Sequence, residues 1–355
     1  MSIIKPRFAD VVAVSSLPRT LVPLPLQTAG QSFKPAKGSS TFGPANRGRP
    51  IHLTATCVVS PSSSNSPNAQ ALHSPVSQPI EIWDIKFAFN VLIPGSSPNL
   101  LAMDGGSILA QLTLNDDMIT NGYVPIWSFD ESTNIVNEQT NGAVNTSGST
   151  DETYNYGEFI WHLPRPLYLR PADQISVSFQ NAGQTAVNAV CRVSLSGCVL
   201  NNTSDPATRA VPYAASYVSP PIVAEATVQT VQSAETDLEN ATDDPITLHK
   251  MTGRVDNYPT SGVGANNHFD DSVLAAGTST DLGFTTSMQA YTGRGTQLIP
   301  YSVNIRDLFG PARSVPLCGI LEPGDYVLVE LAQSGTDAYG QVSVAVVGYR
   351  EIPVR

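Results

Sequence analysis

The chain is 355 residues long, which is more than one small β-sandwich requires and suggests two domains. Only 14% of its residues are charged, whereas about 25% is usual for globular proteins. Ser, Thr, Asn, Gln, Gly and Pro stand in place of Lys and Glu, the usual residues of exposed helix surfaces. The composition therefore argues against a mainly helical protein and favours strands and turns.

The net charge of −11 is distributed unevenly. Residues 1–50 have a net charge of +6, with Asp10 as their one acid, and the rest of the chain has a net charge of −17. The basic residues of this segment are Lys5, Arg7, Arg19, Lys34, Lys37, Arg47 and Arg49. Seven prolines in the same segment remove backbone donors, so we expect an extended arm. Such an arm contacts either an anionic surface or the acidic body of a neighbouring protein, and both remain open.

Neither a membrane span nor a signal peptide is predicted. The sequence has no run of about 18 apolar residues, the length that a transmembrane helix needs. Its first residues, MSIIKPRFADVV, lack the continuous apolar core of a secretory signal. We therefore expect no export by the secretory route.

The region from residue 51 to residue 200 alternates strand patterns with turn residues. Strands are predicted at residues 51–60, 80–93, 108–114, 123–129, 159–169, 174–181 and 189–200. The plainest is QISVSFQN, in which Ile175, Val177 and Phe179 alternate with polar residues. Residues 131–157 are polar and contain glycine, so we expect a long surface loop there.

Residues 201–243 are predicted to form a connector, because this stretch contains four prolines. Its end, residues 223–241, is the one segment in which a helix is conceivable. Several β-branched residues there make an extended segment the alternative. A second β domain is expected over residues 244–355.

Two blocks of the second half repeat blocks of the first half in the same order. PIEIWDIK (79–86) parallels PITLHKMT (245–252), because both place Pro-Ile first and an aliphatic residue two positions later. GYVPIWSFD (122–130) parallels QLIPYSVNIRD (297–307), since both have an apolar-Pro-apolar core that ends near Asp.

A third and longer block follows these two, at residues 163–200 and again at 315–352. Each copy has a Pro-small-Asp turn and then two alternating strands that end at a glycine. Pro171 precedes Gly197 by 26 positions, and Pro323 precedes Gly348 by 25. A unit of about 110–120 residues is too long for a solenoid repeat and fits a complete sandwich. We therefore predict that one β-sandwich was duplicated in tandem.

The Pro-small-Asp turn has a local cause. Proline presets φ, the small residue relieves crowding, and Asp accepts a backbone hydrogen bond. The turn is expected to position the following strand and to carry no chemistry.

Residues that could carry chemistry form no recognisable catalytic motif. The sequence has no GxSxG elbow, P-loop, dinucleotide-binding GxGxxG or HExxH. The cysteines Cys57, Cys191, Cys198 and Cys318 form no CxxC pair, so we expect them to pack as small apolar residues. Cys191 and Cys198 are expected on opposite faces of their strand. We predict no catalytic residue, no metal site and no cofactor.

Two acidic clusters raise the question of a cation site. His268 lies near Asp270 and Asp271, and Asp116 is followed by Asp117. A solvated polar loop is the simpler interpretation of both. A separate group, Trp83, Trp127 and Trp161, lies within apolar strand patterns and is expected in the core rather than on a sugar-binding platform.

The proline-rich arm, the two tandem β units quoted above and the long polar loops resemble the double jelly-roll major capsid proteins of viruses. Those of membrane-containing icosahedral bacteriophages are the nearest in size. The resemblance covers roughly residues 51–355 and rests on the repeated blocks. It implies an all-β fold of two tandem jelly-roll sandwiches, with an arm at 1–50, sandwiches at 51–200 and 244–355, and the connector between them.

The resemblance also implies a role. Three chains would form one capsomer, and capsomers would assemble in the host cytoplasm into the icosahedral shell of a virion. The partners would be further copies and other capsid proteins, with the arm also reaching genome or inner membrane without sequence specificity. No small-molecule substrate is implied.

The alternative is a virion decoration or fibre protein, or a carbohydrate-binding protein with two lectin-like sandwiches. An exposed aromatic platform or a calcium-bound loop in residues 131–157 or 256–272 would favour it.

Overall fold

A computed structural model represents the chain. It describes residues 47–68, 72–74, 77–93, 108–129, 141–144, 153–182, 188–201, 205–220, 229–257, 267–268, 286–309, 314–333 and 340–354, all of which belong to one compact unit. Among the predicted arm residues, Arg47 and Arg49 lie at the start of the first strand. Lys5, Arg7, Arg19, Lys34 and Lys37 lie outside the described residues.

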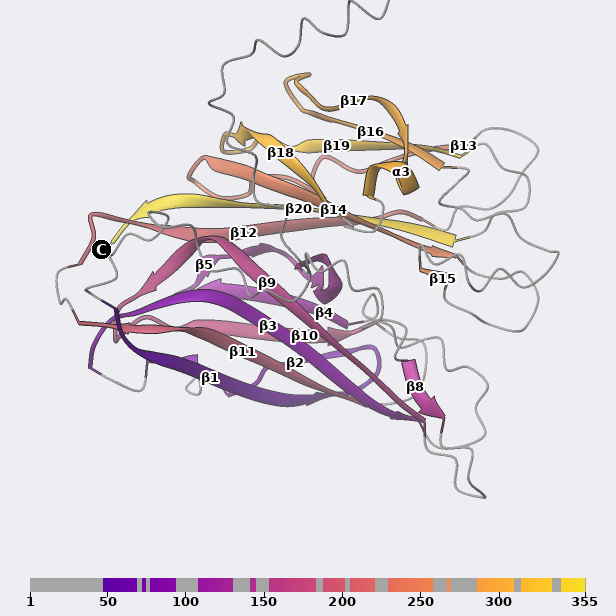
Figure 1. Cartoon of the computed structure of the whole chain (residues 1–355). Coiled ribbons are helices and arrows are strands. Elements are labelled where there is room, and N and C mark those ends of the chain that lie inside the picture. The colour runs from indigo at the N-terminus through magenta and orange to yellow at the C-terminus, as the bar shows by residue number, and fades with distance from the viewer. Residues whose placement is uncertain are drawn as a thin grey trace, which may run out of the picture. The chain divides into compact units, whose positions relative to one another are not determined.

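The first sandwich consists of two sheets (Figure 1). Its elements are β1 (Arg47–Val59), β2 (Ser63–Asn65), β3 (Ile80–Ile93), β4 (Ile108–Leu114), β5 (Asp117–Met118), β7 (Val124–Pro125), the 3-10 helix η4 (Ile126–Phe129), β8 (Asn141–Val144), β9 (Thr153–Leu169), β10 (Ile175–Asn181) and β11 (Ala189–Leu200). One sheet has the order β1-β11-β3-β9-β8. The other has the order β2-β10-β4-β5, and β7 also pairs with β4.

The second sandwich also consists of two sheets. Its elements are β12 (Thr208–Val218), β13 (Gln229–Gln232), β14 (Ile246–Asn257), β15 (Asn267–His268), β16 (Thr286–Thr292), β17 (Gln297–Asn304), the helix α3 (Ile305–Phe309), β18 (Ser314–Leu321), β19 (Val327–Gln333) and β20 (Gly340–Pro353). One sheet has the order β15-β14-β20-β12, with β18 also paired to β14, and the other has the order β13-β19-β16-β17. Strand β6 (Thr120–Asn121) of the first half pairs in parallel with β12.

Both halves have the strand order of a jelly roll. When the main strands of each half are numbered along the chain, with β5 and β7 sharing the fifth position, the sheets read 1-8-3-6 and 2-7-4-5 in both halves. This arrangement of eight strands in two sheets defines a jelly roll. The predicted fold, two tandem jelly-roll sandwiches, is therefore confirmed, and the three repeated sequence blocks fall on corresponding strands.

A shared irregularity strengthens the correspondence. The pairing of β3 with β11 shifts register by one residue beside Gly197, and the pairing of β14 with β20 shifts beside Gly348. A Cβ at Gly197 would lie 1.8 Å from the Glu81 carbonyl oxygen, and a Cβ at Gly348 would lie 2.4 Å from the Thr247 carbonyl oxygen. A β-bulge that requires glycine is thus present at the same place in both sandwiches.

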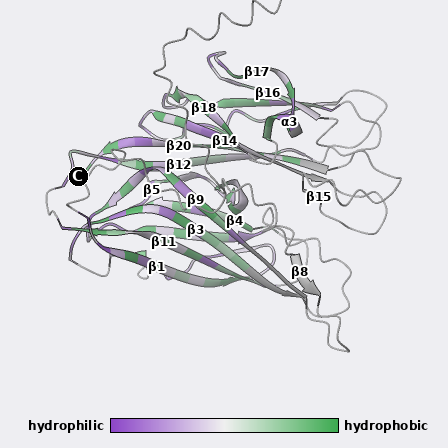
Figure 2. Ribbon diagram, in the orientation of Figure 1, coloured by the Kyte–Doolittle hydropathy of each residue, from purple (hydrophilic) through white to green (hydrophobic). Residues whose placement is uncertain are grey.

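The alternating sequence pattern places one face of each strand in a core. Strand β10, predicted with the greatest regularity, buries every second residue, and so do β4, β16 and β19. Figure 2 shows hydrophobic and hydrophilic residues following each other in short bands along β1, β3 and β9. The centre of the first core is aromatic, because the Phe129 ring stacks on Trp161 at 4.5 Å and on Phe87 at 4.9 Å. Trp127 and Trp161 are buried as predicted, whereas Trp83 is half-buried.

Among the described strands, prolines inside strands lie on sheet edges. They are Pro50 in β1, Pro125 in β7, Pro164 and Pro166 in β9, Pro212 in β12, Pro300 in β17 and Pro316 in β18. Pro353, the last residue of the central strand β20, lies beyond the pairing of β20 with β14. β8 and β6 pair with only short stretches of β9 and β12 that exclude these prolines. Proline has no N–H to give a second neighbour, so the edge is where a sheet tolerates it.

Three segment predictions need correction. Residues 201–243 contain β12 and β13, and residues 229–241 form a strand and turns where a helix was conceivable. Residues 131–157 contain β8 and the start of β9, so they are not one continuous loop. The predicted strand at 123–129 is extended only at Val124–Pro125 and continues as η4.

Candidate functional site: the seam between the sandwiches

The turn between β9 and β10 brings a carboxylate into the interior. Asp173 accepts a hydrogen bond from the Arg170 backbone N–H at 2.8 Å, while its own N–H donates to the Arg170 carbonyl at 3.0 Å. The Pro171–Ala172–Asp173 sequence therefore forms the turn predicted for it, with Asp accepting a backbone hydrogen bond. The side chain of Asp173 is only 1% exposed.

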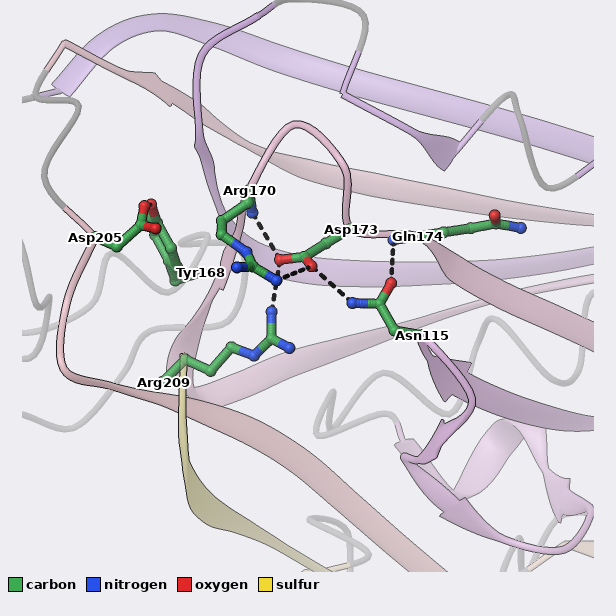
Figure 3. Close-up of polar contacts among 7 residues, drawn as sticks. All are labelled: Asn115, Tyr168, Arg170, Asp173, Gln174, Asp205 and Arg209. Carbon is green, nitrogen blue, oxygen red and sulfur yellow. Dashed lines mark hydrogen bonds and ion pairs between the residues drawn. The ribbon is translucent and has the colours of Figure 1, made fainter. Parts of the chain in front are cut away.

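Asp173 is surrounded by donors from three segments of the chain (Figure 3). Arg209 donates from Nη1 to Oδ2 at 2.6 Å, and Asn115 donates from Nδ2 to Oδ1 at 2.6 Å. Arg170 Nη2 adds a bond to Oδ1 at 3.2 Å. Arg209 is 5% exposed and comes from β12, so a strand of the second jelly roll neutralises a carboxylate of the first.

Asn115 holds its place by an unusual backbone conformation. Its φ is +49°, in the left-handed region that Asn tolerates better than most residues. Its side-chain oxygen accepts from the Gln174 N–H at 2.8 Å, and its own N–H donates to the Gln174 carbonyl at 3.0 Å. The turn after β4 is thereby fastened to the turn before β10.

Two opposing effects act on the pKa of Asp173. Burial raises it, but the hydrogen bonds from Arg170 and Asn115 and the charge of Arg209 together lower it further, so the pKa lies below its usual value. The carboxylate is therefore the stable form, and its ionic state contributes to folding at neutral pH.

The rest of the seam uses side chains on one face of the β14-β20-β12 sheet. Thr252 donates to the Ser128 carbonyl at 3.0 Å and Lys250 donates to the Phe129 carbonyl at 3.4 Å, so both reach η4. Arg350 donates to the Met118 carbonyl at 3.0 Å. The apolar part of the seam consists of Val211, Ala214, Val347 and Ile352, which pack into the first hydrophobic core.

A smaller cluster closes one end of the seam. Tyr168 is 2% exposed and packs with Cys198 and Leu200, against which Val354 near the C-terminus also packs. Its hydroxyl donates to Asp205, and burial together with this bond raises the pKa of Tyr168. The phenol therefore remains protonated and acts as a donor.

The predicted arm residues that the structure describes lie close to this region of the fold. Arg47 pairs with Glu81 at 3.3 Å and lies over the Trp83 ring at 5.1 Å, whereas Arg49 is exposed. Arg209 and Asn115 were not singled out from the sequence. For Arg209, the sequence offered one signal: a charged residue within the mainly apolar segment TRAVPYAASYV.

The two acidic clusters do not converge on a cation site within the described residues. Asp116, in the turn after β4, and Asp117, the first residue of β5, are both exposed, and Asp116 has a φ of +72°. His268 lies in β15, while Asp270 and Asp271 lie outside the described residues. The described part of the chain contains no group of three His, Cys, Asp or Glu residues that could hold a metal. It also contains no helix with the length and hydropathy of a membrane span.

None of the four cysteines forms a disulfide. Cys191 lies in the first core and Cys198 in the Tyr168 cluster, as expected for residues on opposite faces of β11. Burial raises the pKa of Cys191 to about 12 and the pKa of Cys198 to about 11, whereas Cys318 is exposed on β18. Reactivity towards alkylating reagents requires the thiolate and access to it.

Brief treatment of the dilute native chain with iodoacetamide at pH 8 should therefore modify Cys318 first. Peptide mass spectrometry after quenching measures the rate at each cysteine, and the urea-unfolded chain is the control in which all four react. Equal rates at Cys191 and Cys318 in the native chain would contradict the burial of β11.

No model of a protein family and no curated protein matches the sequence. Several solved structures are similar to the chain, at low identity and with TM-scores below 0.5. The PBCV-1 protein fitted into a cryo-EM reconstruction of the virophage Sputnik is 10% identical, with a TM-score of 0.48 over 93% of this chain and 97% of that one. The major capsid protein of bacteriophage PM2 is 9% identical, with a TM-score of 0.38 over 86% and 98% of the two chains. The mavirus major capsid protein is 7% identical, with a TM-score of 0.36 over 99% and 92%.

Proposed function

We propose that this chain is the major subunit of an icosahedral virion shell, that three copies form one capsomer, and that it is not an enzyme. The observation that carries the proposal is the repetition of a complete jelly roll within one chain. Jelly rolls are common in viral capsids. Three chains with two similar sandwiches each would supply six similar units around one axis, a closed arrangement of the kind that symmetric oligomers adopt.

Two further features support a role in association. The seam within the chain already joins two jelly rolls through a buried ion pair and apolar contacts. A jelly roll of this chain can therefore bind another jelly roll side by side. Trp127 and Trp161 are buried, which removes them as the stacking platform of a carbohydrate-binding protein.

We propose boundaries for the parts at the first and last main strands of each sandwich. We place the first jelly roll at residues 47–200, the second at residues 208–353, and the basic arm before residue 47. The arm would contact a neighbouring subunit, the genome or an inner membrane, and the working place of the chain would be the virion after assembly in the host cytoplasm. Other capsid proteins would be its further partners.

Purified full-length chain should form trimers in sedimentation velocity and shells or hexagonal capsomers in negative-stain electron microscopy as concentration rises. Limited proteolysis supplies a second measurement, since the arm should be cut in the monomer and protected after assembly. A chain that stays monomeric at every concentration and salt tested, with an arm cut equally in all fractions, would refute the assembly role.

A further inference from the structure

The seam inside the chain has a counterpart around Ile320, which the described residues of the chain leave exposed. Register defines the correspondence, because Tyr168 pairs with Glu81, the second residue of β3, and Ile320 pairs with Thr247, the second residue of β14. Tyr168 is 2% exposed beneath the C-terminal end of the second jelly roll, whereas Ile320 is 59% exposed. An apolar residue is thus left in water where the first sandwich buries its equivalent.

The turn next to Ile320 repeats the turn of the seam. Asp325 donates its N–H to the Glu322 carbonyl at 2.9 Å, as Asp173 does to Arg170, and the Gly293 N–H donates to the Tyr326 carbonyl as Asn115 does to Gln174. The partner differs, however. Asp325 pairs at 3.1 Å with Arg294, whose side chain is 64% exposed, and not with a buried arginine from another sandwich.

The first jelly roll offers the element that would complete this site. Pro50 of β1 pairs with the residue after Gly197, and Pro212 of β12 pairs with the residue after Gly348. Arg209 lies three residues before Pro212, and Arg47 and Arg49 lie within the three residues before Pro50. Arg47 is engaged by Glu81 and Trp83, so the exposed Arg49 is the arginine available to a second molecule.

Charge favours the same match. Apart from Arg294, the charged described residues next to the Asp325 turn are acidic. They are Glu322 on its edge and Glu235, Asp237 and Glu239 of a preceding loop, in which Glu239 is bridged to Tyr326. The beginning of β1 is basic. A cationic strand end therefore faces an anionic turn, and the attraction is strongest at low salt.

We propose, building on the assembly role, that β18 and the Asp325 turn bind the first jelly roll of a second copy of this chain. In this interface Arg49 of the second copy approaches Asp325 as Arg209 approaches Asp173, and Ile320 is buried as Tyr168 is. The two faces of the contact are different, so it is heterologous and can close into a ring.

Complementation between two variants tests this directly. Ile320→Asp disrupts the contact surface on β18, and Arg49→Glu disrupts the contact surface at the start of β1. Both positions are exposed, so each variant should fold as a monomer. Each variant alone should associate at least 100-fold more weakly than the original chain in sedimentation velocity. A mixture of the two retains one intact contact and should give a heterodimer that neither variant forms alone. Val218→Asp is the matched control, because Val218 is 45% exposed and lies outside the proposed contact.

Cys318 provides an independent readout in the unmodified sequence, since it lies on β18 two residues before Ile320. Its alkylation should slow at least tenfold in oligomers compared with the dilute monomer. Shells in which Cys318 reacts as fast as in the monomer, together with normal assembly of Ile320→Asp, would overturn this contact and leave the assembly role standing. Absence of any oligomer would instead count against both. Protection of Cys318 that does not depend on concentration would assign the site to the chain's own arm and overturn the second-copy assignment.

Discussion

Asp173→Asn should lower the free energy of unfolding by about 3 kcal/mol, because it leaves Arg209 buried without its counter-charge. Arg209 also joins the two sandwiches, so the variant should unfold in two separated steps where the original chain unfolds in one. Urea denaturation followed by the fluorescence of the buried Trp127 and Trp161 measures both effects. Arg165→Gln is the control, since its pair with Glu351 lies on the surface of the same seam and should change stability by no more than about 1 kcal/mol.

The pH dependence of this pair has a definite sign. The pKa of Asp173 is lower in the folded chain than its usual value, so its contribution is complete above the usual carboxyl pKa of about 4 and is lost as the pH falls through the folded pKa. The difference in stability between the original chain and Asp173→Asn should therefore shrink in acid. A difference that stays constant from pH 7 to pH 3 would show that Asp173 is not held as a carboxylate.

Combining Asp173→Asn with Arg209→Met in one chain tests whether the two side chains interact. Removing both charges leaves no uncompensated ion, so the double variant should be more stable than the sum of the two single changes predicts. Strict additivity would mean that the two side chains do not interact in solution.

Gly197→Ala and Gly348→Ala should each destabilise the chain severely, by about 3 kcal/mol or more. The reason is the same in both sandwiches, because the new Cβ would press on a backbone carbonyl of the neighbouring strand. Backbone in the middle of a sheet can move only if the hydrogen bonds between the strands are distorted, so the clash cannot be relieved at low energetic cost. Thermal unfolding and the yield of soluble protein are the measurements.

Gly319→Ala is the matched control for this pair. It also lies within a strand, but its nearest neighbours are side-chain carbons at 3.5 and 3.7 Å, which is ordinary contact. We expect its unfolding temperature to change little. A Gly348→Ala variant with the same unfolding temperature as Gly319→Ala would contradict the close packing of Gly348 against the bulge in β14.

Local sequence patterns were sufficient to predict many of the strands and turns. Strands with strict alternation, such as residues 174–181, and the Pro-small-Asp turns depend on neighbours in sequence, so they could be predicted. The repeated blocks then identified corresponding strands in the two halves. What failed was β12, because Pro212 and its neighbours look like a linker until the sheet edge that tolerates proline is known.

The contact between the two sandwiches could not be predicted from the sequence for a related reason. Asp173 was predicted as a turn residue, but its partner Arg209 is 36 residues away and on the other sandwich. No periodicity links them, and a lone arginine in an apolar segment gives no direction for its side chain. Only packing of two complete sandwiches brings the charges together.

The prolines at the sheet edges have a consequence for how copies can add to one another. A strand whose outer amides are interrupted cannot template another strand, and the remaining edge strands among the described residues, β2, β5, β6, β8, β13 and β15, are only two to four residues long. Growth by continuous hydrogen bonding, the route to fibrils, is thereby obstructed. A protein present at the high local concentrations of particle assembly is left with side-chain contacts of fixed geometry, which can stop when a closed surface is complete.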